Sequence, residues 1–186
     1  MSVDPLVELY RSISPYAYVA NNPIIYIDPD GRKIDPESQE EWDTQKQHII
    51  DKRDNLQSEI NKLNTEAVEK GWSAENLAKK IGNKQDRVSG LNTVISNLAA
   101  LEESTQTYSL NSGATDNKTS YDATTGNIVI SYSGTALFAH EATHAGQFET
   151  GEIAFTSNGS SLAQDVYDEV ASFKVQWAYD PLSVGG

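Results

Sequence analysis

Two of the three histidines in this 186-residue sequence lie four positions apart, as His140 and His144, and Glu141 directly follows the first. In a helix, positions i and i+4 share one face, so both imidazoles can bind the same Zn²⁺ ion at about 2.0–2.1 Å. Glu141 then projects from a neighbouring face, where its carboxylate can take a proton from a water molecule at the metal. The residue types and their spacing therefore predict metal-assisted hydrolysis.

The segment from His140 to His144 has the HExxH pattern, in which the glutamate is the general base of a metallopeptidase. The simpler alternative is an amphipathic helix whose histidines are surface groups or hydrogen-bonded core residues. The flanking residues are apolar or small, namely Ala136, Leu137, Phe138, Ala139, Ala142 and Ala145. Such flanks favour a buried helix, and polar imidazole groups are seldom buried unless they have a bonding partner. We therefore predict a metal site with Glu141 as the catalytic base.

The composition limits both the partners and the ligands. The chain has 14 Lys and Arg against 27 Asp and Glu, a net charge of -13, so we expect no nucleic-acid partner, which would need a basic face. No apolar run approaches the roughly 20 residues that span a bilayer, so we expect no membrane span. There is no cysteine. Any zinc must therefore be held by histidine and carboxylate.

Two histidines leave a catalytic zinc one protein ligand short. The third histidine, His48, lies in a predicted helix beside polar and apolar neighbours, where a solvated or packed role is expected. Residues 164–177 have the apolar spacing of a helix and contain three acidic residues, Asp165, Asp168 and Glu169. Such a group of acids often forms a solvated helix face. The residues alone leave all three open, with Asp165 also suited to orienting a histidine ligand.

A helical hairpin is predicted for residues 35–104. Asp35 can cap the first helix with Pro36 in its first turn, and Ser38 with Glu41 offers an alternative capping box. Gly71-Trp72 interrupts the pattern, and Ser73 can cap a second helix. Apolar residues at heptad-like spacing mark the two helices: Trp42, Ile49, Leu56, Ile60 and Leu63, then Leu77, Ile81, Val88, Leu91, Ile95 and Leu98.

Short strands are predicted after the hairpin, over Thr105–Leu110, Ser120–Ala123 and Asn127–Tyr132. Thr124-Thr125-Gly126 joins the last two as a β-hairpin, and a Ser133-Gly134-Thr135 turn leads into the HExxH helix. The predicted fold class is α+β: a helical hairpin, then a small unit over residues 105–186 with short antiparallel strands and two ligand-bearing helices. Tyr132, Tyr167 and Tyr179 are candidates for stabilising an oxyanion.

Residues 1–34 contain four of the six prolines. Three stretches of this segment carry a family resemblance: Val3-Asp4-Pro5-Leu6, Ser14-Pro15-Tyr16-Ala17-Tyr18-Val19-Ala20-Asn21-Asn22-Pro23-Ile24 and Tyr26-Ile27-Asp28-Pro29-Asp30-Gly31-Arg32. The sequence of this segment resembles the end of the RHS-repeat-associated core domain. The resemblance implies a C-terminal toxin, secreted or delivered at the cell surface, with a cognate immunity protein. It also implies a self-cleavage junction near Asp28 and Asp30. The first residues lack the features of a signal peptide, so export is expected to be encoded elsewhere.

The order strand, turn and HExxH helix, followed by Glu169-Val170-Ala171-Ser172-Phe173, resembles gluzincin-like peptidases and the zincin toxin domains of RHS proteins. In those families the second helix carries Glu, an apolar residue, Ala and then an aromatic residue; this chain has one extra residue before the aromatic. The resemblance implies Zn²⁺ bound by His140, His144 and Glu169, a protein or peptide substrate, and an edge strand beside the metal.

The predicted function is zinc-dependent hydrolysis of peptide bonds, as the toxin part of an RHS-type protein. The alternative is a non-catalytic binding module in which the helical hairpin recognises a partner and the HExxH helix is structural. The predicted segments are an RHS remnant over residues 1–34, a hairpin over 35–104 and a zincin-like catalytic unit over 105–186.

Overall fold

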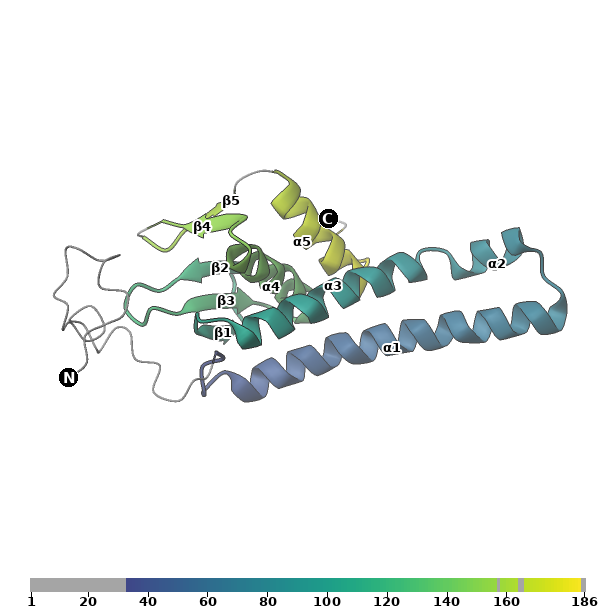
Figure 1. The fold of residues 1–186 in the computed structure, drawn as a ribbon, viewed down its shortest axis with the longest axis horizontal. Helices are drawn as coiled ribbons and strands as arrows, with labels where there is room; N and C mark the ends of the chain where they lie inside the picture. The colour runs from purple at the N-terminus through teal and green to yellow at the C-terminus, as the bar shows by residue number, and fades with distance from the viewer. Residues whose placement is uncertain (1–32, 157, 164–165, 185–186) are drawn as a thin grey trace, which may run out of the picture. The chain divides into compact units, whose positions relative to one another are not determined.

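The computed structural model describes residues 33–156, 158–163 and 166–184, which belong to one compact unit, Lys33–Gly186. The RHS-like segment, with Asp28 and Asp30, lies outside the described residues, and so does Asp165. The described chain has five helices, a three-stranded sheet and a two-stranded sheet (Figure 1). The α+β fold class and the helical hairpin predicted from the sequence are confirmed.

The hairpin is formed by α1 (Gln39–Lys70), α2 (Ala74–Ile81) and α3 (Lys84–Glu103), which run side by side in Figure 1. Gly71 ends α1 in the left-handed conformation, with φ 63°. Ser73 caps α2 as predicted, since its side chain accepts a hydrogen bond from the Asn76 N–H at 3.3 Å. The buried residues of α1 include Trp42, Ile49 and Leu56, which are three of the predicted apolar positions.

Two local details differ from the sequence prediction. The second arm is not one helix but two, because Gly82 adopts φ 54° and ψ -131°, which no helix can continue. The first helix begins at Gln39 with Ser38 at the N-cap position, as in the alternative prediction, but the Ser38 side chain makes no cap hydrogen bond. The Asp35 side chain accepts from the Glu37 N–H at 2.9 Å, and the Ser38 hydroxyl accepts from the Leu110 N–H at 2.9 Å. Ser38 therefore ties the hairpin to the sheet.

The larger sheet has the order β1-β3-β2, with β1 at Tyr108–Ser112, β2 at Lys118–Tyr121 and β3 at Ile128–Tyr132. β2 and β3 form the predicted antiparallel hairpin. β1 pairs with β3 in parallel, which the sequence pattern did not predict. The segment after β1 crosses to the far edge before β2 begins, so β3 enters between them. The strand that leads into the HExxH helix is therefore central, and β1 and β2 lie at the two edges.

α4 (Thr135–Glu149) carries the HExxH segment and lies between the sheet, α3 and α5 (Val166–Tyr179). In the chain between α4 and α5, β4 (Ile153–Phe155) and β5 (Ser161–Ala163) form a small antiparallel hairpin. α3 and α5 approach closely at Gly90, where an added Cβ would lie 2.8 Å from the Ala178 Cβ. This close approach holds α5 against the hairpin.

One hydrophobic core joins the hairpin to the rest of the unit. The Phe138 ring of α4 packs edge-to-face on Trp42 of α1, with ring centroids 5.9 Å apart, and on Tyr132 of β3 at 5.1 Å. The same core includes Leu91 and Leu98 of α3 and Val175 of α5. The boundary between residues 35–104 and 105–186 stays a sequence-based prediction, but the two segments share this core. None of the described helices has the length and apolar character to cross a membrane.

Candidate metal centre

The HExxH helix places both histidines on one buried face of α4. The exposed fractions of His140 and His144 are 7% and 8%. Their Nε2 atoms lie 3.2 Å apart, and their ring centroids lie 5.0 Å apart. Two atoms that bind one zinc tetrahedrally at about 2.0–2.1 Å are separated by roughly 3.3 Å. The two imidazoles therefore have the spacing of a ligand pair.

Glu169 of α5 supplies a carboxylate at the same point. Its Oε2 lies 3.6 Å from His140 Nε2, and its Oε1 lies 3.6 Å from His144 Nε2. One ligand atom from each of the three residues falls within a span of 4.8 Å. Across the described ranges, this is the one group of three or more His, Asp or Glu residues that could hold a metal ion. A displacement of a few tenths of an ångström would give it tetrahedral spacing.

The other candidate ligands lie elsewhere or cannot be placed. Asp168 is buried and is not part of the group; its backbone carbonyl accepts hydrogen bonds from Gln147 Nε2 and Ser172 Oγ. His48 of α1 lies near Thr135, with Nδ1 3.4 Å from the threonine hydroxyl. The resemblance selected Glu169 among the three acidic residues, and of the two that the structure describes, Glu169 is the one that lies beside both histidines.

A glutamine lies behind each histidine. His140 Nδ1 is 2.9 Å from Oε1 of Gln176, and His144 Nδ1 is 2.8 Å from Oε1 of Gln147. Each glutamine amide nitrogen donates to a backbone carbonyl at 3.0 Å, that of Ser183 for Gln176 and that of Asp168 for Gln147. These bonds fix the amide orientation, so the oxygen faces the imidazole. Each Nδ1 must then carry the proton and donate it.

With both protons on Nδ1, the two Nε2 lone pairs converge. The pKa of His140 is lowered, mainly by burial and secondly by the nearby His144. The protonated form of His140 is therefore disfavoured. Two neutral nitrogen acceptors and one carboxylate thus face a common point. Such a donor set fits a divalent cation and suits zinc in particular, which binds imidazole and carboxylate with one position left for water.

Replacing Gln176 with leucine should weaken zinc binding by about 10- to 100-fold, because the imidazole would lose the acceptor that fixes its tautomer. Competition titration against a chelating dye measures this change. Gln45→Leu is the matched control, since Gln45 is also buried and hydrogen-bonded but lies on α1 beside Glu41. An equal loss in both variants would assign the effect to general destabilisation.

Glu141 stands beside this group without belonging to it. Its side chain is buried, and the Thr119 hydroxyl of β2 lies 2.7 Å from the Glu141 backbone carbonyl and 3.2 Å from its Oε2. Burial is the main cause that raises the pKa of Glu141 to about 7, and the carboxylate of Glu169 adds to it. A carboxyl group with this pKa can accept and return a proton near neutral pH. The role of Glu141 as a general base stays a prediction from the sequence.

No protein-family model, curated protein sequence or solved structure matches this chain. The resemblances to the RHS core and to gluzincin-like peptidases therefore stay sequence-based predictions. The candidate metal centre rests on the geometry of its own residues.

The raised pKa of Glu141 predicts a pH-dependent stability of the metal-free protein. A carboxyl whose pKa rises from 4.5 to about 7 on folding stabilises the fold fully below pH 4.5, and this contribution disappears as the pH rises through 7. Glu141→Gln should therefore match the parent near pH 4.5 and exceed its free energy of unfolding near pH 8, by on the order of 3 kcal/mol. Urea unfolding with a chelator present, at both pH values, measures the difference.

Glu152→Gln is the control for this comparison, because Glu152 is exposed just beyond α4. The same pH profile in both variants would contradict the burial of an ionisable Glu141.

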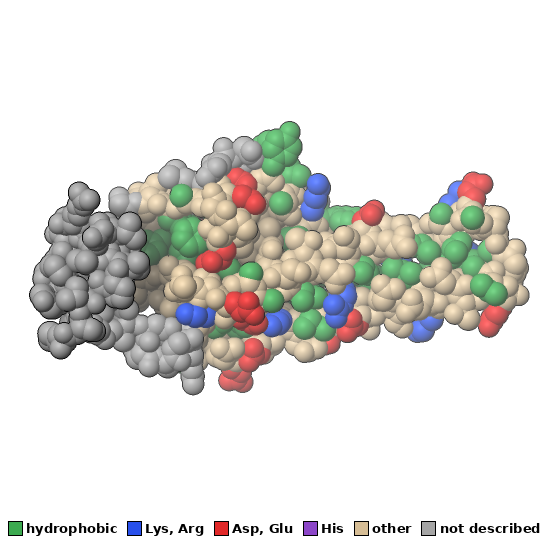
Figure 2. Space-filling model, viewed as in Figure 1, with side chains coloured by type: hydrophobic (Ala, Val, Ile, Leu, Met, Phe, Trp, Pro, Cys, Tyr) green, Lys and Arg blue, Asp and Glu red, His purple; other side chains and the backbone are tan. Residues whose placement is uncertain are grey.

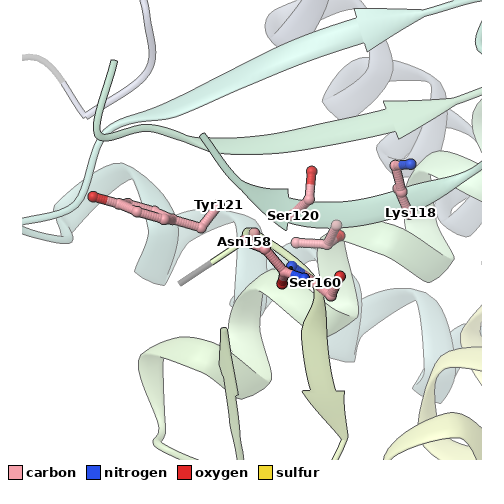
Figure 3. Close-up of a pocket in the computed structure, with 7 residues that line it drawn as sticks. Lys118, Ser120, Tyr121, Asn158 and Ser160 are labelled. Atoms are coloured by element: carbon pink, nitrogen blue, oxygen red, sulfur yellow. Dashed lines mark hydrogen bonds between the residues drawn. The ribbon is translucent and has the colours of Figure 1, made fainter. Parts of the chain in front are cut away.

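A polar pocket lies between β2 and the turn that joins β4 to β5 (Figure 3). Its lining residues are Lys118, Thr119, Ser120, Tyr121, Asn158, Gly159 and Ser160. The Tyr121 N–H donates to the Gly159 carbonyl at 3.1 Å, and a Cβ at Gly159 would collide with the Tyr121 carbonyl. Thr119 lines this pocket and also contacts Glu141. Glu141 is not among the lining residues, so Thr119 is the residue that the pocket and the candidate base have in common.

The three tyrosines differ in their surroundings. Tyr132 is buried in the core and donates its hydroxyl to Glu41 Oε1 at 2.5 Å, so it is occupied as a structural donor. The Tyr179 ring lies 5.7 Å from Lys52 Nζ. Tyr167 is 75% exposed on the first turn of α5, two positions before Glu169. Of the three, Tyr167 lies nearest in the chain to the metal group.

Sequence reasoning missed three residues of this site, Thr119, Gln147 and Gln176. Gln147 lies three positions after His144, and Gln176 lies seven positions after Glu169, so both share a helix face with a ligand. That spacing was a usable signal. Thr119 comes from a strand whose pairing was needed to bring it to Glu141, and nothing local marks it.

Proposed function

We propose that this protein hydrolyses peptide bonds with one Zn²⁺ held by His140, His144 and Glu169. The observation that carries the proposal is the convergence of two Nε2 atoms and a carboxylate, with both Nδ1 atoms facing amide oxygens. When bound, zinc supplies Lewis-acid polarisation of the scissile carbonyl and lowers the pKa of a water molecule.

Glu141 acts as the general base in this proposal. It takes the proton from water and later gives it to the leaving amine nitrogen. Thr119 orients the Glu141 side chain through its hydroxyl. Burial keeps the carboxylate away from bulk water. In the metal-free chain burial raises the pKa of this carboxyl to about 7, and a bound Zn²⁺ would lower it toward the charged form that accepts a proton.

An edge strand, β2, supports an extended substrate. β2 pairs with β3 on one side, and its other side faces the pocket toward Asn158 and Ser160. The Tyr121 N–H on that side is bonded to Gly159, so the edge proposed for a substrate is the first part of the strand, residues 118–120. A peptide in extended conformation can lie along such an edge and place its carbonyl beside Glu141. Protein or peptide is therefore the substrate class that we propose.

The biological setting follows from the resemblance of residues 1–34 to the end of an RHS core. We propose a secreted or cell-surface-delivered toxin whose activity is opposed by an immunity protein. A protease acting inside a recipient cell would require such an inhibitor in the producing cell.

The proposal is tested with the full chain. Purified protein should contain close to one zinc per chain, by elemental analysis, and should cleave denatured casein. A chelator should remove both zinc and cleavage, and added zinc should restore both. Stable zinc binding without cleavage of any peptide would favour the binding-module alternative, and failure to bind zinc would contradict the metal centre itself.

A further inference from the structure

The first two turns of α5 carry a concentrated apolar surface. Val166, Tyr167, Val170 and Phe173, here called the α5 stripe, have exposed fractions of 67%, 75%, 38% and 50%. Elsewhere in the described residues, the exposed large hydrophobic side chains are Val68, Leu182 and Val184. Isolated apolar residues on a surface are ordinary, whereas a contiguous group marks a binding site. The α5 stripe is such a group.

The α5 stripe is continuous with the metal centre. Val166, Val170 and Phe173 are spaced by four and three residues, so they lie along one helix face. Glu169 lies one turn before Phe173 on that side of the helix. The Phe173 ring packs edge-to-face on the His140 ring, with centroids 4.8 Å apart. Figure 2 shows hydrophobic side chains gathered over the start of α5, at the upper edge of the molecule.

We propose that the α5 stripe receives an apolar side chain next to the scissile bond, which makes the substrates peptides with an aromatic or large aliphatic residue there. This inference rests on the proposed function. A peptide carbonyl near Glu169 and His140 brings the adjacent side chain close to Phe173, because the Phe173 ring packs on the His140 ring and Glu169 Oε2 lies 3.6 Å from His140 Nε2. Val170 lies one turn from Phe173 on the same helix face.

The chemistry of the stripe favours aromatic side chains over others. A large ring covers Val166 and Val170 together and can meet Phe173 edge-to-face. A charged side chain would lose hydration against the same surface and gain no comparable contact. Val166, Val170 and Phe173 keep exposed fractions of 67%, 38% and 50%, so a ligand can bury further apolar area on them.

Two metal-binding probes test this without relying on catalysis. Acetohydroxamate reports on the zinc alone, and 3-phenylpropionohydroxamate adds a benzyl group to the same chelating head. With zinc-loaded full chain, calorimetry should give about tenfold tighter binding for the benzyl compound. In Val166→Ser/Val170→Ser, this ratio should fall below about threefold while acetohydroxamate binds as before. Tyr167→Ser is a second variant with the same expected direction.

Val68→Ser is the matched control, because Val68 is 85% exposed on α1, outside the stripe. Its hydroxamate ratio should equal that of the parent. Equal affinities of the two probes for the parent protein, or a preference that survives in the double variant, would overturn the inference and leave the proposed function standing.

Two other outcomes also decide against it. If zinc-loaded protein binds neither hydroxamate, the zinc has no open coordination position, and the proposed hydrolysis and this inference fall together. If sedimentation shows a dimer that the double variant converts to a monomer, the stripe is covered by a second copy of the chain, and its role in substrate recognition is excluded.

Discussion

Glu141→Gln is expected to keep its zinc and to lose peptide hydrolysis by a factor of about 10² or more. Glutamine has nearly the same shape, can still meet the Thr119 hydroxyl and remains outside the ligand group. It cannot accept the proton of the attacking water. Zinc content by elemental analysis and initial rates on a quenched fluorescent peptide give the two readings.

Glu152→Gln serves as its control, since it removes an exposed carboxylate close to the same helix. Its rate should stay within about twofold of the parent, as for most surface changes. Undiminished hydrolysis by Glu141→Gln would exclude Glu141 as the base, whatever the metal content.

Glu169→Gln is expected to lower zinc affinity itself, by more than the 10- to 100-fold typical of residues behind the ligands. The reason is that it removes the charged member of the three-residue group, whose oxygens lie 3.6 Å from the two Nε2 atoms. His144→Ala should abolish zinc binding altogether. Competitive titration with a zinc chelator measures each affinity.

Asp168→Asn is the informative comparison, because Asp168 is adjacent in sequence and buried but lies outside the metal group. Asp165→Asn completes the set of acidic residues on this segment. Both should keep zinc within about tenfold of the parent, since neither removes a ligand. If either loses the metal while Glu169→Gln retains it, the third ligand is wrongly assigned.

Local sequence determined the parts of this protein that depend on spacing along the chain. The four-residue interval between His140 and His144 fixes both imidazoles on one face wherever a helix forms. Gly71 and Ser73 define the turn of the hairpin through their own backbone and side-chain preferences. The Thr124-Thr125-Gly126 turn likewise joins β2 to β3, with φ 78° at Gly126. These features need no distant contact.

The candidate ligand set was determined only in part by the sequence. The HExxH pattern predicted two ligands and a base, and it left Asp165, Asp168 and Glu169 as candidates for the third ligand. The choice depends on how α5 is rotated about its axis against α4. That rotation follows from packing, including the close approach of Ala178 to Gly90, and one step of about 100° would present a different side chain.

Only the tertiary structure decided which groups support the ligands. In the sequence, residue type alone does not distinguish Gln147 and Gln176 from other helical glutamines. In the folded chain their amide nitrogens donate to the backbone carbonyls of Asp168 and Ser183, which orients their amide oxygens toward the histidines. Thr119 reached Glu141 only because β2 became an edge strand of a sheet whose order is not the order of the chain. Hydrogen bonds between distant residues depend on the relative placement of whole elements, which local propensity and periodicity do not encode.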